Sequence, residues 1–310
     1  MNPPPPVVMV RPQPQPAPRG PERGQFTLQA ALRKNAPPWF SIGQYDPTDR
    51  RPLYWFWSFL DARAAIEEDR ARRPYVLGPN VFFADCHHIG RDHHERRLLA
   101  YRSCVLHFTE SQWYADLIRE AYGQHGRQAP PIALWPYPVE DIPGPIEPAT
   151  IDLLIYAKTG HTAEAIGHLQ KRWPNCAVFR YGRFDRADLI DTARRARACA
   201  YFSRDDRGPI ALAEILAAGC PAVGTRRGAP WLSGGRFGIT AADLSGPSMA
   251  AALDDLFGIH PSRQACARFA GQHFDPDRVA DVIFLHLDKA RCRLALASSP
   301  LPASLNRPKI

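Results

Sequence analysis

The chain has 310 residues, a length that suits about two domains of roughly 150 residues, each with its own core. Lysine and arginine number 39 against 31 aspartates and glutamates, and this formal charge of +8 permits an anionic partner. No apolar run reaches the roughly 18 residues of a membrane span, and the proline-rich start lacks the apolar core of a signal peptide. Neither membrane insertion nor secretion is therefore expected.

The cysteines are odd in number, widely spaced and mostly within apolar runs. This usage is typical of reduced core residues in a cytoplasmic protein rather than of a disulfide framework. They are Cys86, Cys104, Cys176, Cys199, Cys220, Cys266 and Cys292.

The first half of the chain is interpreted as α/β. Residues 1–23 are proline-rich and are expected to be flexible, and a first domain is predicted over 24–140. Short apolar runs predict strands at 7–10, 39–42, 75–80, 103–108 and 131–135. Helices are predicted at 95–100 and 111–122, the second with Ser111 as its N-cap.

Four histidines, His87, His88, His93 and His94, cluster with Asp85, Cys86 and Glu95 in a polar stretch of this half. These residue types could hold a metal, but the adjacent histidines lack the i, i+4 helical spacing of common zinc sites. Two other readings stay open, namely a solvated loop and a contact from His87 or His88 to a bound ligand. No metal site is predicted.

A proline-rich, acidic stretch, VEDIPGPIEPAT, ends the first half, and residues 141–150 are predicted to be a linker. Beyond it, strands are predicted at 151–157, 177–181 and 198–202. Helices are predicted between them, at 162–173 and 185–195. Strands that alternate with ten-residue helices indicate a parallel, doubly wound sheet.

The most informative stretch is Cys199–Thr225, CAYFSRDDRGPIALAEILAAGCPAVGT. The apolar run ending at Phe202 predicts a buried strand, which the polar residues after it break. Pro209 suits the first turn of a helix over 210–218, and Gly219 suits its C-terminal cap. The result is a βαβ unit with a helix start at the carboxyl end of a strand, where open α/β sheets bind ligands and where phosphate is favoured.

Two carboxylates in this unit, Asp206 in the turn and Glu214 on the helix, are candidate ligand-binding residues. A carboxylate accepts from two neighbouring hydroxyls at once, so Glu214 suits a ribose diol, each charged hydrogen bond contributing roughly 1.5–3 kcal/mol. Arg204 and Arg207 in the same turn suit a diphosphate. The residues alone equally allow Asp206 to be a helix cap and Glu214 to be an ion-paired residue.

The pattern resembles the GT-B-fold glycosyltransferases, in particular the large retaining group with a Glu-x7-Glu motif, also called glycosyl transferases group 1. That family carries EA-x-A-x-G-x-PV after the motif, and AEILAAGCPAV follows it closely here. The resemblance implies an α/β GT-B fold, with two Rossmann-like domains, parallel sheets and a cleft between them. The domain over 151–275 would bind a nucleotide-sugar donor.

The resemblance also implies roles for single residues. Glu214 would hold the ribose. Asp206 would stand in for the family's first Glu against the donor sugar, and because it is shorter by one methylene, the sugar would sit closer or the contact would be weaker. Lys158 and Arg204 would face the diphosphate. His88 would contact the sugar. Lys158 is equally a candidate for a solvated loop residue.

The remaining implied donor contacts lie in two short segments. Gly208, Pro209 and Ile210 form the expected helix start against the diphosphate. Tyr181 and Gly182 follow a strand where the family seats the base, although Tyr181 also suits ordinary core packing.

Two further stretches resemble parts of the same family. VLHFTESQWYADLIREAYG in the first half follows the acceptor domain's order of strand, Ser and helix, although that domain is reduced and lacks the glycine-rich opening turn. FDPDRVADVIFLHLDKA resembles the closing helix, predicted over 276–297 before a flexible tail at 298–310. Asp275 and Asp277 are interpreted as a helix cap rather than a metal-binding pair.

The resulting hypothesis is a retaining hexosyltransferase that uses a UDP- or GDP-linked sugar without a metal or other cofactor. Its acceptor would be a glycan, a lipid-linked molecule or a small molecule, in the cytoplasm or peripherally at the inner membrane face. Two alternatives stay open. The basic charge permits a DNA-modifying glycosyltransferase acting on nucleic acid. The aspartate at position 206 permits a non-catalytic sugar-nucleotide-binding protein.

Overall fold

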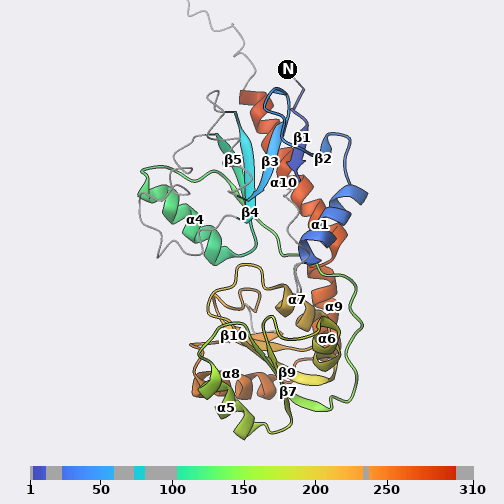
Figure 1. The fold of residues 1–310 in the computed structure, drawn as a ribbon, viewed down its shortest axis with the longest axis vertical. Helices are drawn as coiled ribbons and strands as arrows, with labels where there is room; N and C mark the ends of the chain where they lie inside the picture. Colours follow the sequence, from blue (N-terminus) through green and yellow to red (C-terminus); the bar gives the residue numbers. More distant parts are fainter. Residues whose placement is uncertain (1–2, 12–22, 59–72, 81–102, 233–236, 298–310) are drawn as a thin grey trace, which may run out of the picture.

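The computed structural model describes residues 3–11, 23–58, 73–80, 103–232 and 237–297, which form two α/β domains stacked end to end (Figure 1). The first domain holds a six-stranded parallel sheet in the order β2-β1-β3-β4-β5-β6. Its strands are β1 (Val7–Val10), β2 (Phe40–Gly43), β3 (Leu53–Ser58), β4 (Tyr75–Asn80), β5 (Cys104–Thr109) and β6 (Ile132–Leu134).

The second domain holds a five-stranded parallel sheet in the order β11-β10-β9-β7-β8. Its strands are β7 (Ile151–Ala157), β8 (Cys176–Arg180), β9 (Ala196–Phe202), β10 (Ala222–Thr225) and β11 (Gly238–Ala241). Its helices are α5 (Ala163–Arg172), α6 (Arg186–Arg195), α7 (Ile210–Ala217), α8 (Gly246–Ile259) and α9 (Arg263–His273).

The first sheet is covered on both faces. One face packs against α1 (Arg23–Lys34) and the closing helix α10 (Pro276–Ala297), with Trp55 in contact with this layer. The other face packs against α4 (Gln112–Gln124), and Tyr54 and Phe56 lie on that side. Because β3 sits between two covered faces, every one of its side chains is buried.

The second sheet is sandwiched in the same way. Helices α6, α7 and α9 contribute to the core on one face, and α5 and α8 to the core on the other. Apart from Glu214, helix α7 is apolar, and each of its residues after Ile210 is buried, Glu214 included. A helix of that composition suits a fully enclosed position between a sheet and a neighbouring helix.

The closing helix α10 follows α9 and runs back from the second domain onto the first (Figure 1). Its N-terminus is capped by Asp275, whose Oδ1 accepts from the Arg278 backbone N–H at 2.8 Å, as predicted. Asp277 faces the end of α1, where it accepts from Lys34 Nζ at 2.6 Å and from Asn35 Nδ2 at 2.8 Å. Asp275 and Asp277 therefore stabilise a helix start and a helix–helix contact.

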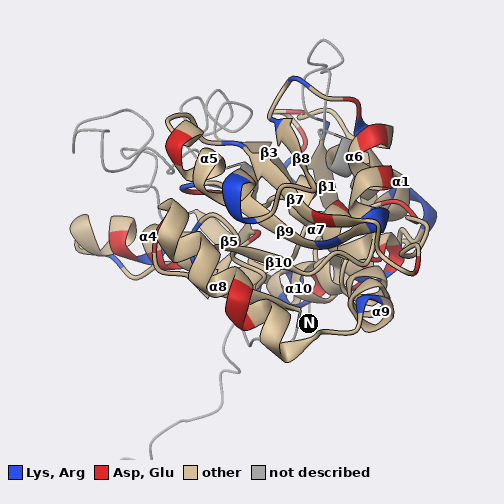
Figure 2. Cartoon of the chain, turned by 90° about the horizontal axis from the view of Figure 1, so that it is seen from below, with Lys and Arg blue, Asp and Glu red and all other residues tan. Residues whose placement is uncertain are grey.

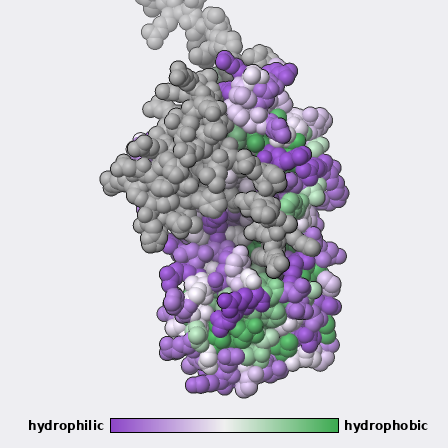
Figure 3. Space-filling model, viewed as in Figure 1, coloured by the Kyte–Doolittle hydropathy of each residue, from purple (hydrophilic) through white to green (hydrophobic). Residues whose placement is uncertain are grey.

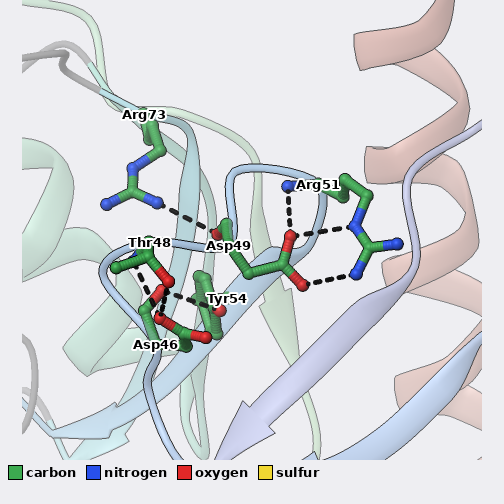
Figure 4. Close-up of polar contacts among 6 residues, drawn as sticks. All are labelled: Asp46, Thr48, Asp49, Arg51, Tyr54 and Arg73. Carbon is green, nitrogen blue, oxygen red and sulfur yellow. Dashed lines mark hydrogen bonds and ion pairs between the residues drawn. The ribbon is translucent and has the colours of Figure 1, made fainter.

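The loop between β2 and β3 is ordered by its own polar side chains (Figure 4). Asp46 Oδ1 accepts from the Thr48 backbone N–H at 2.8 Å and from its hydroxyl at 2.6 Å. Asp49 accepts from the backbone and the guanidinium of Arg51, and this partner holds the pKa of its carboxyl down at about 2. Arg73 Nη1 donates to the Asp49 carbonyl at 3.1 Å, which ties the loop to the segment before β4.

The predicted fold class, two parallel α/β sheets, is confirmed, and most predicted element bounds agree within two residues. The sequence reading did not predict β3, β11, α1, α8 or α9. Ser111 takes the N-cap position of α4 as predicted, although its side chain makes no capping hydrogen bond. Pro209 precedes α7 as its N-cap residue rather than lying in its first turn.

The predicted helix at 95–100 and the histidine cluster around His88 lie outside the described residues. The domain limits, with a linker at 141–150, stay a prediction. The described cysteines form no disulfide with one another, and Cys104, Cys199, Cys220 and Cys266 are buried. Within the described ranges, no helix is both long enough and apolar enough to cross a membrane.

The packing of α10 gives a first prediction. Leu287 is fully buried against the first sheet, so Leu287→Ala should lower the free energy of unfolding by about 2–5 kcal/mol, because it removes apolar contacts and leaves a cavity. The measurement is urea-induced unfolding followed by circular dichroism. Leu285→Ala, on the exposed face of the same helix, is the matched control and should change stability by less than about 0.5 kcal/mol. Equal losses in the two variants would contradict this packing.

Candidate functional site

The candidate site lies at the carboxyl edge of the second sheet. All five strands are parallel, so their carboxyl ends meet at one edge, which is where ligands bind in open α/β sheets. Lys158 follows β7, Tyr181 follows β8, and the turn with Asp206 follows β9. The structure therefore brings together residues that lie up to 48 positions apart in sequence.

Lys158 and Asp206 form an ion pair at this edge. The Lys158 Nζ donates to Asp206 Oδ2 at 2.7 Å, and the Tyr201 hydroxyl donates to the same oxygen at 3.2 Å. Asp206 is buried whereas a third of the Lys158 side chain is exposed. Burial raises the pKa of the Asp206 carboxyl, and Lys158 acts in the opposite direction. The Lys158 side chain thus lies between a buried carboxylate and solvent, where it can also bind an anionic ligand.

Glu214 lies one and a half turns into α7 and is also buried and paired. Arg186, the first residue of α6, donates from Nε to Glu214 Oε1 at 2.5 Å. The Nη1 of Arg186 is 3.8 Å from Glu140 Oε2 in the segment that joins the two domains. The expectation that Glu214 is ion-paired is thus compatible with a ligand role, because Arg186 fixes the position of the carboxylate.

Two tyrosines interact with these carboxylates. Tyr156 in β7 and Tyr201 in β9 stack with ring centroids 5.1 Å apart and an interplanar angle of 8°. Tyr156 interacts electrostatically with both Asp206 and Glu214, and its hydroxyl is buried without a hydrogen-bond partner. Neither tyrosine was singled out from the sequence, although both stand at or next to the end of an apolar strand that leads into the site.

The outer rim of the site is basic and aromatic. Tyr181 is 47% exposed, and Lys158 Nζ lies 5.4 Å from its ring centroid, so Tyr181 is not a core residue. Gly182 has a φ of 73°, a conformation that suits glycine in this tight turn. Arg204 is exposed, and its backbone N–H donates to Thr159 Oγ1 at 2.8 Å. That bond places Arg204 beside the loop that carries Lys158.

The start of α7 lies against the first domain. The first N–H groups of an α-helix have no intrahelical acceptor, so the turn from Gly208 to Ile210 can receive an anion. A Cβ at Gly208 would lie 2.7 Å from Tyr137 Cδ2 and 2.9 Å from Glu110 Cγ, side chains of the other domain. Only a glycine allows the backbone to approach the first domain this closely.

Several site residues were not found from the sequence. Arg186 was read only as part of an amphipathic helix, and Glu110 only as part of an acceptor-domain pattern. Glu110 follows directly after β5, and a polar residue at the carboxyl end of a buried strand was the signal available. Within the part of the chain that is described, no group of three His, Cys, Asp or Glu side chains is placed to hold a metal ion.

No protein-family model and no curated protein matches the chain, but solved structures do. Anabaena HepE, in complex with UDP and glucose, aligns with a TM-score of 0.59 and 13% identity over 92% of this chain and 100% of HepE. Sucrose-phosphate synthase from Thermosynechococcus elongatus aligns with a TM-score of 0.62 and 12% identity over 94% and 100%. A chain of the GtfA/B complex aligns with a TM-score of 0.55 and 12% identity over 78% of this chain and 57% of that chain.

The chain has the GT-B fold. This confirms the fold that the motif at 199–225 led us to expect. In this GT-B chain the carboxyl ends of both sheets meet at the interface between the domains, since residues after β5 contact residues after β9. The candidate site residues of the second domain lie at that interface.

The close approach at Gly208 gives a second prediction. Gly208→Ala should lower the free energy of unfolding by about 1–3 kcal/mol, because the new methyl group meets two buried side chains of the first domain. Thermal and urea-induced unfolding measure this. Gly167→Ala, in the interior of α5 with open space around its Cβ position, is the control and should stabilise the protein by about 0.5–1 kcal/mol. A neutral Gly208→Ala would show that the domains are not in contact here.

Proposed function

We propose that this chain is a glycosyltransferase that moves a sugar from a UDP- or GDP-linked donor to an acceptor, and that it does so with retention and without a metal. The observation that supports this most directly is the pair of buried carboxylates, Asp206 and Glu214, at a helix start on a GT-B fold. The solved structures with this fold include HepE with UDP and glucose and the glycosyltransferase WaaG.

The donor would lie across the carboxyl edge of the second sheet. Glu214, held by Arg186, would accept from the ribose hydroxyls. Tyr181 offers an exposed ring against which a base can stack, and Lys158 with Arg204 would meet the diphosphate. Asp206 would accept from a hydroxyl of the donor sugar, and Lys158 would be shared between that carboxylate and the phosphate.

Sugar transfer develops negative charge on the departing diphosphate and positive charge at the anomeric carbon. The Lys158 ammonium, the Arg204 guanidinium and the N–H groups at the start of α7 would stabilise the leaving group. Because Asp206 already bonds Lys158 and Tyr201, it would also keep the ammonium in place before the donor arrives. In this proposal these side chains and N–H groups supply the charge stabilisation, and no divalent cation is required.

The acceptor would be a glycan, a lipid-linked molecule or a small molecule, used in the cytoplasm or at the inner face of the membrane. Figure 2 shows Lys and Arg interspersed with Asp and Glu along the described helices and loops. Polar and apolar residues are likewise mixed on the visible face of the second domain (Figure 3). This distribution favours a small, localised anionic ligand, the donor diphosphate, over an extended nucleic-acid surface.

The donor site gives a third prediction, testable by calorimetric titration with UDP, GDP, dTDP and ADP and their sugar conjugates. One nucleotide should bind the wild type, and Glu214→Ala should weaken that binding by roughly 10- to 100-fold, because charged hydrogen bonds to the ribose are lost. The anomeric configuration of the product, read by NMR, then tests retention.

The matched control is Glu164→Ala, which removes an exposed carboxylate from the first turn of α5 and should leave nucleotide affinity unchanged. Circular dichroism checks that both variants are folded. If no nucleotide binds the wild type, or if Glu214→Ala binds as tightly as Glu164→Ala, the proposed donor site is wrong.

A further inference from the structure

The loop that follows β10 carries two adjacent arginines, Arg226 and Arg227, to which the proposed donor site assigns no role. Strand β10 pairs in parallel with β9, so this loop and the turn with Asp206 leave the same edge of the second sheet side by side. The Asp206 backbone N–H donates to the Arg227 carbonyl at 2.9 Å. The two arginines therefore lie next to the carboxylate that the proposed function places against the donor sugar.

Contacts to the end of β9 hold this loop in place. Thr225 Oγ1 donates to the Ser203 carbonyl at 3.0 Å and accepts from the Gly228 backbone N–H at 3.1 Å. The Ala229 backbone N–H donates to the Thr225 carbonyl at 2.8 Å. A Cβ at Gly228 would collide with the Ser203 carbonyl, so the close approach requires glycine. None of these contacts uses an arginine side chain, and substitutions of Arg226 and Arg227 leave them intact.

The same loop borders the first domain. The Arg227 guanidinium carbon lies 5.5 Å from the ring centroid of Trp113 in α4, and the Trp113 indole N–H donates to the Asp206 carbonyl at 3.3 Å. At the other end of the loop, the Trp231 indole N–H donates to the Glu110 carbonyl at 3.2 Å. A ligand bound by Arg227 would therefore lie between the domains and beside the sugar end of the proposed donor site. An acceptor must take that position to reach the anomeric carbon.

Positive charge is in excess around this loop. In the described parts of the loops after β7, β9 and β10, five Lys and Arg side chains accompany two aspartates, namely Lys158, Arg204, Arg207, Arg226 and Arg227 with Asp205 and Asp206. Lys158 is paired with Asp206, and Arg207 is directed toward the first domain, where its Nη1 donates to the Tyr114 hydroxyl oxygen at 3.4 Å. The other three arginines have only Asp205 as an acidic neighbour in these loops.

These three arginines are exposed and weakly paired. Among the described residues, the Arg204 and Arg226 side chains form no ion pair. The Arg227 side chain is 48% exposed, and its Nη1 lies 3.7 Å from Asp205 Oδ1, a longer separation than the 2.7 Å between Lys158 and its carboxylate partner. A donor diphosphate that binds Lys158 and Arg204 leaves Arg226 and Arg227 available for a second anionic group.

We propose that Arg226 and Arg227 bind a phosphate group of the acceptor, an inference that rests on the proposed function. A guanidinium presents its N–H donors in a planar fork that matches phosphate oxygens. Two adjacent guanidinium groups without a close carboxylate suit a phosphate better than the hydroxyl groups of a neutral sugar. The acceptor is then a phosphorylated small molecule or a lipid-linked phosphate rather than a neutral glycan.

The test uses the full chain with its donor site filled by the nucleotide that binds in the calorimetric titration. The probes are glucose 6-phosphate, glucose, and phosphatidylcholine vesicles with and without phosphatidic acid. Glucose 6-phosphate or the phosphatidic acid vesicles should bind, whereas glucose and pure phosphatidylcholine should not. Binding of glucose 6-phosphate indicates a small phosphorylated acceptor, and binding of the phosphatidic acid vesicles alone indicates a phosphate carried by a lipid.

Arg226→Gln and Arg227→Gln should each weaken phosphate binding by roughly tenfold, because charged hydrogen bonds are lost. Arg227→Lys, which keeps the charge but not the planar fork, should lose less affinity than Arg227→Gln. Arg268→Gln, which removes an exposed arginine from α9, is the matched control and should bind the probes like the wild type. Nucleotide affinity should stay at the wild-type value in all four variants, and circular dichroism checks that they are folded.

Three results would overturn the proposal. The first is that no phosphate probe binds; if Arg227→Gln then also lowers the melting temperature, Arg227 is only a contact to Trp113. The second is that Arg226→Gln and Arg227→Gln bind the probes as tightly as Arg268→Gln. The third is that Arg227→Gln weakens nucleotide and phosphate binding equally, because Arg227 then acts through the donor site.

The two proposals fail differently. If the wild type binds no nucleotide, the proposed donor site is wrong, and the probes are titrated into the nucleotide-free protein. Loss of phosphate binding in Arg227→Gln but not in Lys158→Gln then supports the phosphate site after β10, and the reverse pattern overturns it. If a nucleotide binds but neither phosphate probe does, the donor site stands and the phosphate-binding role of Arg226 and Arg227 is wrong.

Discussion

A carboxylate removed from water must meet a cation or several donors, and this constraint organises the candidate site. Asp206 meets Lys158, and Glu214 meets Arg186. Each cation comes from a different segment than its carboxylate, so the charges can be satisfied only when the strands and helices of the second domain are assembled together. The polar site is thus specified by the same contacts that fold this domain. A ligand that enters it finds charged groups already oriented, which lowers the reorganisation that binding requires.

The motif at 199–225 and the closing helix could be predicted from the sequence because local signals agree there. In the motif, an apolar strand, a breaking turn, Pro209 and Gly219 all point to one βαβ unit. The strand at 53–58 was missed for a physical reason. Its run of tyrosine, tryptophan and phenylalanine has no polar alternation, since both faces of the strand are covered, and periodicity alone does not identify such a strand.

The site was only partly predictable, because its residues are adjacent in space and not in sequence. Lys158, Asp206 and Glu214 were found because each stands at a strand end or on the first helix of the unit. Arg186 was not, since nothing in a single sequence shows which cation a buried carboxylate will meet. Glu110 was not either, although it directly follows a buried strand. The GT-B fold itself persists at 12–13% identity to HepE and sucrose-phosphate synthase because layered parallel sheets need only apolar patterning and not particular side chains.

The path of α10 affects how the protein is made. The first sheet is built from the earliest residues of the chain, yet one of its faces is covered by the last described helix, and Arg291 donates to the carbonyls of Pro4 and Pro5. During synthesis the first domain must therefore wait, with an apolar face only partly covered, until the second domain and then α10 have left the ribosome. Because the first domain is completed by a segment that follows the second, the order of translation differs from the order of final packing, and the partly covered face is prone to aggregation until α10 has been made.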